Sequence, residues 1–378
     1  MNLTFAPAEL VKFDLLASGI VVTQAAEQFI GEANKGRPMS SADYASTSGL
    51  ILRLDGDVWV NAPTNEHNAN FVDAAPYVLL ADDGRLFVDG PHGRVGAHMW
   101  LQPDWHERTT TGGDPYRRVG VAHTDRVRVS PIEGCAYTCT FCDLPFEYRY
   151  RSKSVDALLE TVAAALSDPD QSSGHVLISG GTPRPEDYDY VRECYESILA
   201  HFPGVPVDIM MVPLREILDL ENLSSLGLQE ISINIEIWSR DIARRVMPRK
   251  YKQGRDFYLD FLSEAAEILG GGNVRSMLMV GIEPLEETLA GVEAIAQRGC
   301  VPVLSPFRPD PATPLRDWPA PSAEFLKTAY SESWAITRHY DVALGPACMP
   351  CAHNTLTLPS GLGHGSADTS FGQPRLAG

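Results

Sequence analysis

A repeated alternation of short apolar strands and longer helices, which begins near residue 125, constrains the fold of this chain more than any other feature. The expected strands are short and rich in β-branched residues, as buried parallel strands are, and they cover Val127–Val129, Val176–Ser179, Val207–Val212, Glu230–Ile237, Val274–Val280 and Val301–Ser305. The expected helices are Val155–Leu166, Tyr188–Ala200, Leu214–Leu226, Arg255–Leu269, Leu285–Gln297 and Ala323–His339. Six such units in succession predict an α/β fold, in which a parallel sheet with right-handed crossovers closes wholly or partly into a barrel.

The segment before the barrel has a different pattern. Residues 1–120 are predicted to form a small α+β domain, because helical periodicity over 7–33, interrupted near Gly19, is followed by two hairpin signals. In these hairpins Asp55-Gly56 and Asp83-Gly84 separate β-rich runs. Asp-Gly suits a two-residue type I′ turn, since glycine accepts positive φ at little cost.

The barrel is placed at residues 121–340 and is followed by a C-terminal extension, residues 341–378. In this extension Val342–Leu344 could add a seventh strand, and the tail from about Leu358 is rich in Gly, Ser and Pro. Loops that follow the strands of a parallel barrel form one face, where active sites collect. We therefore expect functional residues on these loops.

Composition narrows the function. The chain of 378 residues carries 31 Lys and Arg against 49 Asp and Glu, a formal charge of −18, which argues against a nucleic-acid or anionic-membrane partner. Its first residues lack the pattern of a secretory signal, and no apolar run is long enough to span a bilayer. Seven cysteines, three of them within eight residues, favour a reducing compartment, the cytoplasm, with metal-bound thiolates.

The cysteines Cys135, Cys139 and Cys142 follow the first predicted barrel strand with the spacing C-x3-C-x2-C, and Phe141 precedes the third. Three thiolates in one loop can hold three irons of a [4Fe–4S] cluster and leave the fourth iron open for chemistry. A structural zinc site or plain buried cysteines are the alternatives. Zinc would need a fourth ligand, and the next cysteine, Cys194, lies inside a predicted helix.

At these residues the chain resembles the radical S-adenosylmethionine (SAM) superfamily, over about residues 120–310. The resemblance implies a partial (βα)6 TIM-like barrel in which SAM chelates the open iron. One-electron reduction then gives methionine and a 5′-deoxyadenosyl radical, which abstracts hydrogen from the substrate. Residues 280–309 are most similar to the biotin synthase and thiamine-pathway branch.

Other positions match family motifs one by one. The loop S-G-G-T-P, with Ser179, Gly180, Gly181 and Thr182, resembles the glycine motif that binds the SAM amino group, although a tight turn is the simpler alternative. The resemblance makes Asn234 and Glu236, two apart on a strand and hence on one face, the ribose contacts. It also implies cofactor contacts at Phe141 and Gly281.

Two glutamates and one arginine near the last two predicted barrel strands are further candidate site residues. Glu283 and Glu286 could lie near the adenine or in a solvated first helical turn. Arg308 follows the sixth predicted strand and could bind a carboxylate or phosphate of the substrate, or form a surface salt bridge.

A second cysteine pair, Cys348 and Cys351, precedes His353 and Asn354. If Val342–Leu344 is a strand, this loop emerges on the catalytic face opposite the triad. The pair could ligate an auxiliary iron–sulfur cluster, return a hydrogen atom or electron to a product radical, bind zinc, or be structural. A cluster would need His353, another non-cysteine ligand, substrate or an open iron, because the remaining cysteines are expected in the core.

The sequence therefore predicts an enzyme that cleaves SAM at a [4Fe–4S] cluster and abstracts hydrogen from a small molecule, with a flavodoxin- or ferredoxin-type electron donor. Sulfur insertion through an auxiliary cluster is one form of this hypothesis. Two alternatives remain: a peptide-modifying enzyme whose residues 1–120 recognise a leader peptide, and a non-catalytic iron–sulfur sensor or scaffold.

Overall fold

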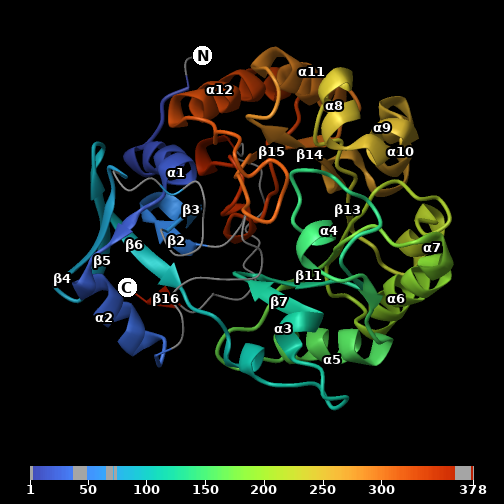
Figure 1. Ribbon diagram of the computed structural model, residues 1–378, viewed down its shortest axis with the longest axis horizontal. Coiled ribbons are helices and arrows are strands. Elements are labelled where there is room, and N and C mark those ends of the chain that lie inside the picture. Colours follow the sequence, from blue (N-terminus) through green and yellow to red (C-terminus); the bar gives the residue numbers. More distant parts are fainter. Residues whose placement is uncertain (1–2, 37–48, 65–70, 72–74, 362–375, 378) are drawn as a thin grey trace.

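The computed structural model describes residues 3–36, 49–64, 71, 75–361 and 376–377, which form two seven-stranded sheets, one two-stranded sheet and their helices (Figure 1). One seven-stranded sheet, the barrel sheet, contains the six predicted parallel strands in chain order, with one antiparallel strand at an edge. In spatial order they are β7 (Gly120–His123), β8 (Arg126–Val129), β11 (His175–Ser179), β12 (Val207–Met210), β13 (Glu230–Ser232), β14 (Val274–Val280) and β15 (Val301–Pro306). The sheet curls, so the predicted partial barrel is confirmed.

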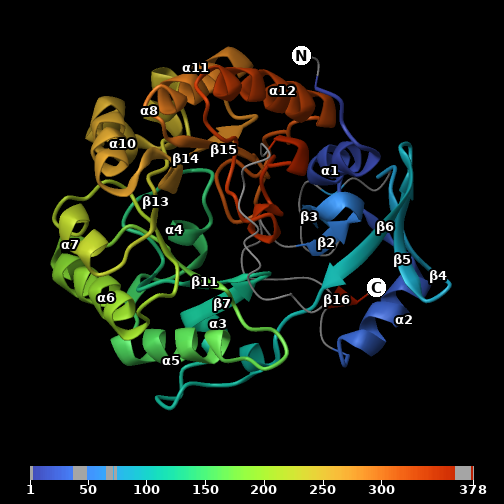
Figure 2. The ribbon, with the colours of Figure 1, turned by 180° about the vertical axis from the view of Figure 1, so that it is seen from behind.

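Helices cover the outer face of this curled sheet in both views (Figures 1 and 2). The six predicted ones are α5 (Val155–Leu166), α6 (Tyr188–His201), α7 (Leu220–Ser225), α10 (Arg255–Leu269), α11 (Leu285–Ala296) and α12 (Ala323–His339). Ser154 and Ser322 cap α5 and α12 by accepting backbone N–H groups. These caps fix the residues at which the two helices begin. Among the described helices, none is both long and apolar enough to cross a membrane.

Shorter elements lie in the loops between these units. They are α3 (Tyr116–Val119), β9 (Ile132–Glu133), α4 (Leu144–Glu147), β10 (Arg151–Ser152), α8 (Arg240–Val246) and α9 (Pro248–Gln253). The last two lie between β13 and α10, where the sequence pattern predicted a longer strand and a loop.

Alternation along the strands separates the core from the barrel interior. In β14, Val274, Leu278 and Val280 are fully buried, whereas Arg275 and Met277 line a cavity of about 260 Å³ inside the barrel. Successive side chains of a strand point to opposite faces. One set of alternate side chains therefore packs beneath the helices, and the other set faces an interior space.

Three predicted elements differ from the structure. Strand β13 ends at Ser232 rather than at residue 237, because Glu236 has a positive φ of 65° that extended backbone does not allow. The helix expected from Leu214 begins at α7, after Asp219 accepts the N–H of Asn222. The expected seventh strand at 342–344 is wrong, since this stretch is irregular and lies between positive-φ residues at 341 and 345.

The other seven-stranded sheet, the N-terminal sheet, is built from N-terminal residues and residues 376–377. Its path is β1 (Val21–Val22), β4 (Val78–Asp82), β5 (Arg85–Gly90), β6 (Gly93–Trp100), β2 (Leu50–Leu54) and β3 (Val58–Ala62), with β16 (Leu376–Ala377) on β6. The helices α1 (Pro7–Ser18) and α2 (Gln24–Ala33) flank it and are separated near Gly19, as predicted.

Both predicted hairpins are present, as β2–β3 and β4–β5. Asp83 and Gly84 have φ values of 48° and 70°, which is the signature of a type I′ turn. The other turn contains three residues, 55–57, with positive φ at Gly56 and Asp57. The two-residue turn predicted there is therefore wrong by one residue.

The N-terminal sheet lies beside the open side of the barrel, between the β7 and α12 ends (Figures 1 and 2). Buried polar contacts connect the two parts. Arg308 donates to the backbone and side-chain oxygens of Asn61 in β3, and Asn61 N–H donates to His353 O at 2.7 Å. Lys12 of α1 donates to the carbonyl oxygens of Ala352 and Thr357 at 3.0 and 2.7 Å.

The buried Lys12 predicts a specific dependence of stability on pH. Burial lowers the pKa of Lys12 to about 7, against a smaller opposing effect of Glu9, whereas lysine in an unfolded chain titrates near 10.4. Between these values the unfolded state binds more protons, so Lys12 makes the free energy of unfolding rise with pH by up to about 1.4 kcal/mol per unit. We expect Lys12→Met to flatten this rise in urea unfolding between about pH 7.5 and 9.5. A difference between the two proteins that does not change with pH would contradict this account.

Candidate functional site

The loop that follows β8 and β9 carries the cysteine triad. Backbone hydrogen bonds hold this loop at both ends, from Ala136 N to Thr182 O at 2.9 Å and from Thr140 N to Val246 O at 2.8 Å. Gly134, with φ 73°, makes the turn into the triad. The three cysteines therefore lie at the carboxyl end of the barrel, where the sequence placed them.

The environment of the triad suits iron ligation. Cys135 Sγ accepts the N–H groups of Tyr137 and Thr182 at 3.3 and 3.1 Å, and such bonds stabilise a cluster thiolate. Burial, followed by the charge of Glu236, raises the pKa of Cys139 to about 12. Burial and Asp143 raise the pKa of Cys142 well above its usual value. A bound metal ion would stabilise the thiolates and offset this effect of burial.

An apolar cluster covers the triad. It contains Cys139 and Phe141 together with residues from α8 and from the loops that follow the barrel strands, including Ile237, Met247 and Phe307. Phe141 also lines the barrel cavity. A dry, low-dielectric surrounding of this kind excludes water from reactive species.

The glycine loop packs directly against the triad loop. A Cβ at Gly181 would overlap Gly134 O and approach Cys135 Cα, and one at Gly180 would overlap the side chain of Ser130. Glycine is thus required here by packing, whatever ligand binds. Ser179 lines the barrel cavity, and Thr182 contacts the triad sulfur through its N–H. Direct SAM contacts of these residues stay predictions.

Asn234 and Glu236 do not continue one regular strand face, because the backbone turns at Glu236. Asn234 lines the barrel cavity, and its Oδ1 accepts Met277 N–H at 3.0 Å. Glu236 forms a 2.7 Å ion pair with the buried Lys250. The ammonium of Lys250 also donates to Asn234 O at 3.1 Å.

The sequence prediction missed Lys250. Burial acts to lower its pKa, but Glu236 and then Cys139 outweigh burial and raise it. The lysine is therefore charged next to the triad. Its neighbours Arg249 and Lys252 carry the same charge, so the sequence contains no local signal that distinguishes the buried cation.

The sequence left two alternative places for Glu283 and Glu286, and the structure gives these glutamates different surroundings. Glu286 is exposed, as in a solvated helical turn, whereas Glu283 is buried and accepts the N–H groups of Trp238 and Ser239. Burial raises the pKa of Glu283 to about 7. Gly281 has φ 106°, and a Cβ there would touch Pro321. Backbone conformation and packing therefore also explain why glycine occupies this position.

Arg308 is not part of a surface salt bridge. It is buried, lines the barrel cavity and binds Asn61 of the N-terminal sheet. The structure thus gives Arg308 a partner within the chain, and the predicted contact with a substrate anion stays untested.

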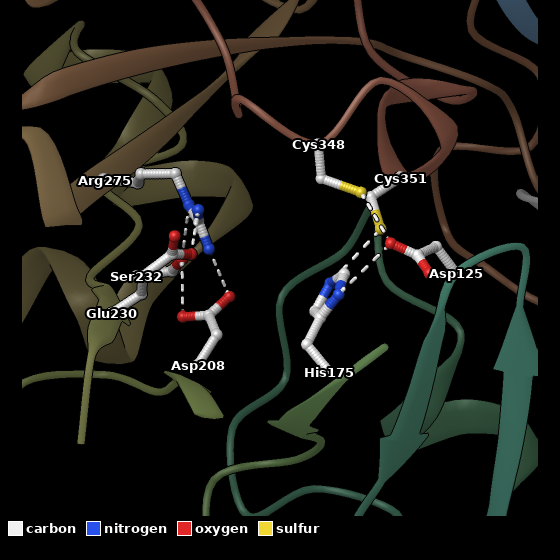
Figure 3. Close-up of polar contacts among 8 residues, drawn as sticks. All are labelled: Asp125, His175, Asp208, Glu230, Ser232, Arg275, Cys348 and Cys351. Carbon is white, nitrogen blue, oxygen red and sulfur yellow. Dashed lines mark hydrogen bonds and ion pairs between the residues drawn. The ribbon is translucent and has the colours of Figure 1, made fainter. Parts of the chain in front are cut away.

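The second cysteine pair lies at the opposite end of the barrel from the triad, so its expected place on the catalytic face is wrong. Cys351 Sγ is 3.3 Å from Nε2 of His175, the first residue of β11, and Cys348 Sγ is 3.7 Å from Oδ2 of Asp125, just before β8 (Figure 3). The segment reaches this end because no strand precedes it. His175 and Asp125 were missed by the sequence prediction.

His353 does not join this group. Its Nδ1 is 2.9 Å from Pro350 O, and its ring lies 6.0 Å from the ring of His123. Burial, followed by the charge of His123, lowers the pKa of His353 well below its usual value. The histidine that lies next to Cys351 is thus His175 rather than His353.

A cavity of about 880 Å³ borders the triad loop and was not predicted. Despite the negative charge of the chain, six cations line it against the two carboxylates Glu133 and Glu147. These cations are Arg117, Arg118, Arg128, Arg149, Arg151 and Lys153. A concave site with one dominant sign of charge concentrates ligands of the opposite sign.

Comparisons with known proteins identify the part of the chain that carries the triad. Residues 129–299 match the family model described as Radical SAM superfamily. These residues therefore form a domain of this superfamily. The comparisons do not single out the biotin synthase and thiamine-pathway branch expected from residues 280–309.

The individual relatives are distant. Bacteriochlorophyllide c C-7(1)-hydroxylase of Chlorobaculum limnaeum is 23% identical over 167 residues, 41% of this chain and 42% of that protein, so the chain matches less than half of its length. A radical SAM methyltransferase from Sphaerobacter thermophilus has 15% identity and a TM-score of 0.47, covering 75% of this chain and 82% of that one. The FeFe-hydrogenase maturase HydG from Carboxydothermus hydrogenoformans has 15% identity and a TM-score of 0.44, covering 61% and 56%.

Proposed function

We propose that the protein is a radical SAM enzyme that cleaves SAM reductively and abstracts hydrogen from an anionic small molecule. The observation that carries the proposal is the placement of three thiols, in one anchored loop under an apolar cover, at the carboxyl end of a partial barrel whose sequence matches the superfamily. When bound, the cluster supplies one electron and SAM supplies the 5′-deoxyadenosyl radical.

The residues of the chain have distinct tasks in this proposal. Cys135, Cys139 and Cys142 hold the cluster, and the N–H groups that reach Cys135 keep its sulfur in place. The ion pair of Lys250 with Glu236 fixes the turn beside Cys139. The apolar cover excludes water, which protects a carbon radical from side reactions.

The basic cavity supports the anionic class of substrate. At about 880 Å³ it is large enough for a small molecule, and its cations offer partners for carboxylate or phosphate groups. Because the cavity reaches Gly134 and Gly180, a ligand in it would lie next to the triad loop. Residues 1–120 are proposed as a domain that completes substrate recognition, with the barrel at 121–340.

The cellular setting is proposed on the same basis. All seven cysteines are free, which supports a reducing compartment, the cytoplasm. The electron donor is proposed to be of the flavodoxin or ferredoxin type, and the charge of −18 supports the absence of a nucleic-acid partner. Sulfur insertion would require an auxiliary cluster, and the geometry at Cys348 and Cys351 favours another kind of site.

The test is an anaerobic assay of the full chain after reconstitution with iron and sulfide. With SAM and dithionite, we expect 5′-deoxyadenosine and methionine in equal amounts, and neither product without reductant. A small-molecule extract divided on an anion-exchange resin then tests the substrate class, since the retained fraction should accelerate product formation. Acceleration by unretained molecules or only by peptides would contradict the anionic small molecule. A protein with about four irons that forms no 5′-deoxyadenosine would overturn the enzymatic proposal in favour of a sensor.

A further inference from the structure

We propose that Cys348, Cys351, His175 and Asp125 bind a single zinc ion at the amino end of the barrel. This site is separate from the cysteine triad and does not depend on SAM chemistry. It uses two ligands from the C-terminal segment and two from the starts of neighbouring barrel strands (Figure 3).

The donor atoms of His175, Cys348 and Cys351 lie close enough together to share one ion, and Asp125, which lies outside this group of three, is the further donor next to Cys348 for the fourth position. One ligand atom from each of His175, Cys348 and Cys351 lies within 4.8 Å of the other two. The distance between Cys351 Sγ and His175 Nε2 is 3.3 Å, and that between Cys348 Sγ and Asp125 Oδ2 is 3.7 Å. Metal–ligand bonds of about 2.0–2.3 Å place tetrahedral ligand atoms roughly 3.3–3.8 Å apart.

Asp125 adds an independent indication that the group is built for a cation. Its side chain is only 4% exposed, and its Oδ1 is buried without a hydrogen-bond partner among the described residues. Its Oδ2 lies 3.6 Å from His175 Nδ1. A buried carboxylate oxygen without a partner is unfavourable, and a metal ion bound by this group would offset that cost.

The compactness of the group argues against an auxiliary iron–sulfur cluster. The thiolates of a [4Fe–4S] cluster bind different irons, so they lie farther apart than the ligands of one ion. The triad itself does not form such a compact group of three. The other two cysteines, Cys194 and Cys300, are buried in the core and belong to α6 and to the residue before β15.

The donor set favours zinc over other ions. Two thiolates, one imidazole and one carboxylate combine soft and borderline ligands, a mixture that Zn²⁺ accepts and that Mg²⁺ or Ca²⁺ does not. With four protein ligands the site is closed, as structural zinc sites are. Zinc would therefore fasten the C-terminal segment, whose carbonyls at 352, 353 and 357 bind Lys12 and Asn61, to the barrel.

The test measures metal content of the full chain. We expect wild type purified under reducing conditions and loaded with Zn²⁺ to keep about one zinc per chain after dialysis, besides the iron of the reconstituted triad. Cys348→Ser/Cys351→Ser and His175→Ala should lose zinc and keep iron. His353→Ala is the matched control, because this buried histidine is close in sequence but outside the group, and it should keep zinc.

A second measurement needs no variant. Co²⁺ bound to wild type should show the intense visible bands of a tetrahedral ion and thiolate-to-cobalt charge transfer. The proposal would be overturned if bound Co²⁺ showed octahedral bands or if His175→Ala retained zinc. It would also be overturned if wild type failed to retain zinc. Extra iron and sulfide that disappear in the double cysteine variant would overturn it as well, since they would establish a cluster. Zinc content is read without turnover, so its outcome is independent of the proposed enzymatic activity.

Discussion

Replacing Cys142 by alanine is expected to reduce 5′-deoxyadenosine formation to the level without reductant, whereas Cys194→Ala leaves it near that of wild type. Cys142 is one of three thiols that can hold the cluster, and a cluster with only two protein ligands would not survive. Cys194 is fully buried, whereas Cys142 is partly buried, and Cys194 lies in α6, within the core beneath the helices.

Iron content and product formation, measured on the same anaerobic samples, check this prediction. Iron should fall from about four per chain to background in Cys142→Ala and stay unchanged in Cys194→Ala. Equal losses in both variants would mean that any buried cysteine supports the fold to the same extent. In that event the triad would have no special role.

The second large effect concerns the buried ion pairs of the barrel interior. Arg275 binds Asp208 and Glu230, and Ser232 donates to Asp208 (Figure 3). Arg275→Met would leave the buried carboxylate of Asp208 without its cation, which typically lowers the free energy of unfolding by about 3–5 kcal/mol. Glu230 is affected less, because its side chain is 39% exposed.

Urea unfolding of the metal-free proteins measures this effect. The double variant Arg275→Met/Asp208→Asn should recover most of the loss, since no unpaired charge remains. Arg192→Met is the matched surface control, because its partner Asp189 is 90% exposed, and it should change stability by less than about 1 kcal/mol. If Arg275→Met lowered the free energy of unfolding no more than this control does, the barrel interior would have to be hydrated.

The sequence predicted the barrel well, and it placed the three cysteines in one loop at the carboxyl end of the barrel, because both depend on local patterns. Val274–Val280 is a strand at the predicted residues, since its alternation of apolar side chains matches the burial that the barrel imposes. The three cysteines lie within eight residues, so their spacing alone suggests a site there.

The remaining features depend on contacts between distant segments. His175 and Asp125 are 176 and 223 residues from the cysteines they approach, and no spacing rule connects them. Adjacency therefore favoured His353, which is incorrect for this group. The left-handed backbone at Glu236 likewise ends β13 early, although the β-branched residues around it favour a strand.

The contacts of Lys12 have a consequence for the order of folding during synthesis. Its partners, Ala352 and Thr357, lie 340 and 345 residues later in the chain. At about 5–20 residues per second, a ribosome exposes α1 for many seconds before these carbonyls emerge. Until then the ammonium of Lys12 remains hydrated, and the apolar face around it lacks its cover. The N-terminal part is thus translated first but completed last.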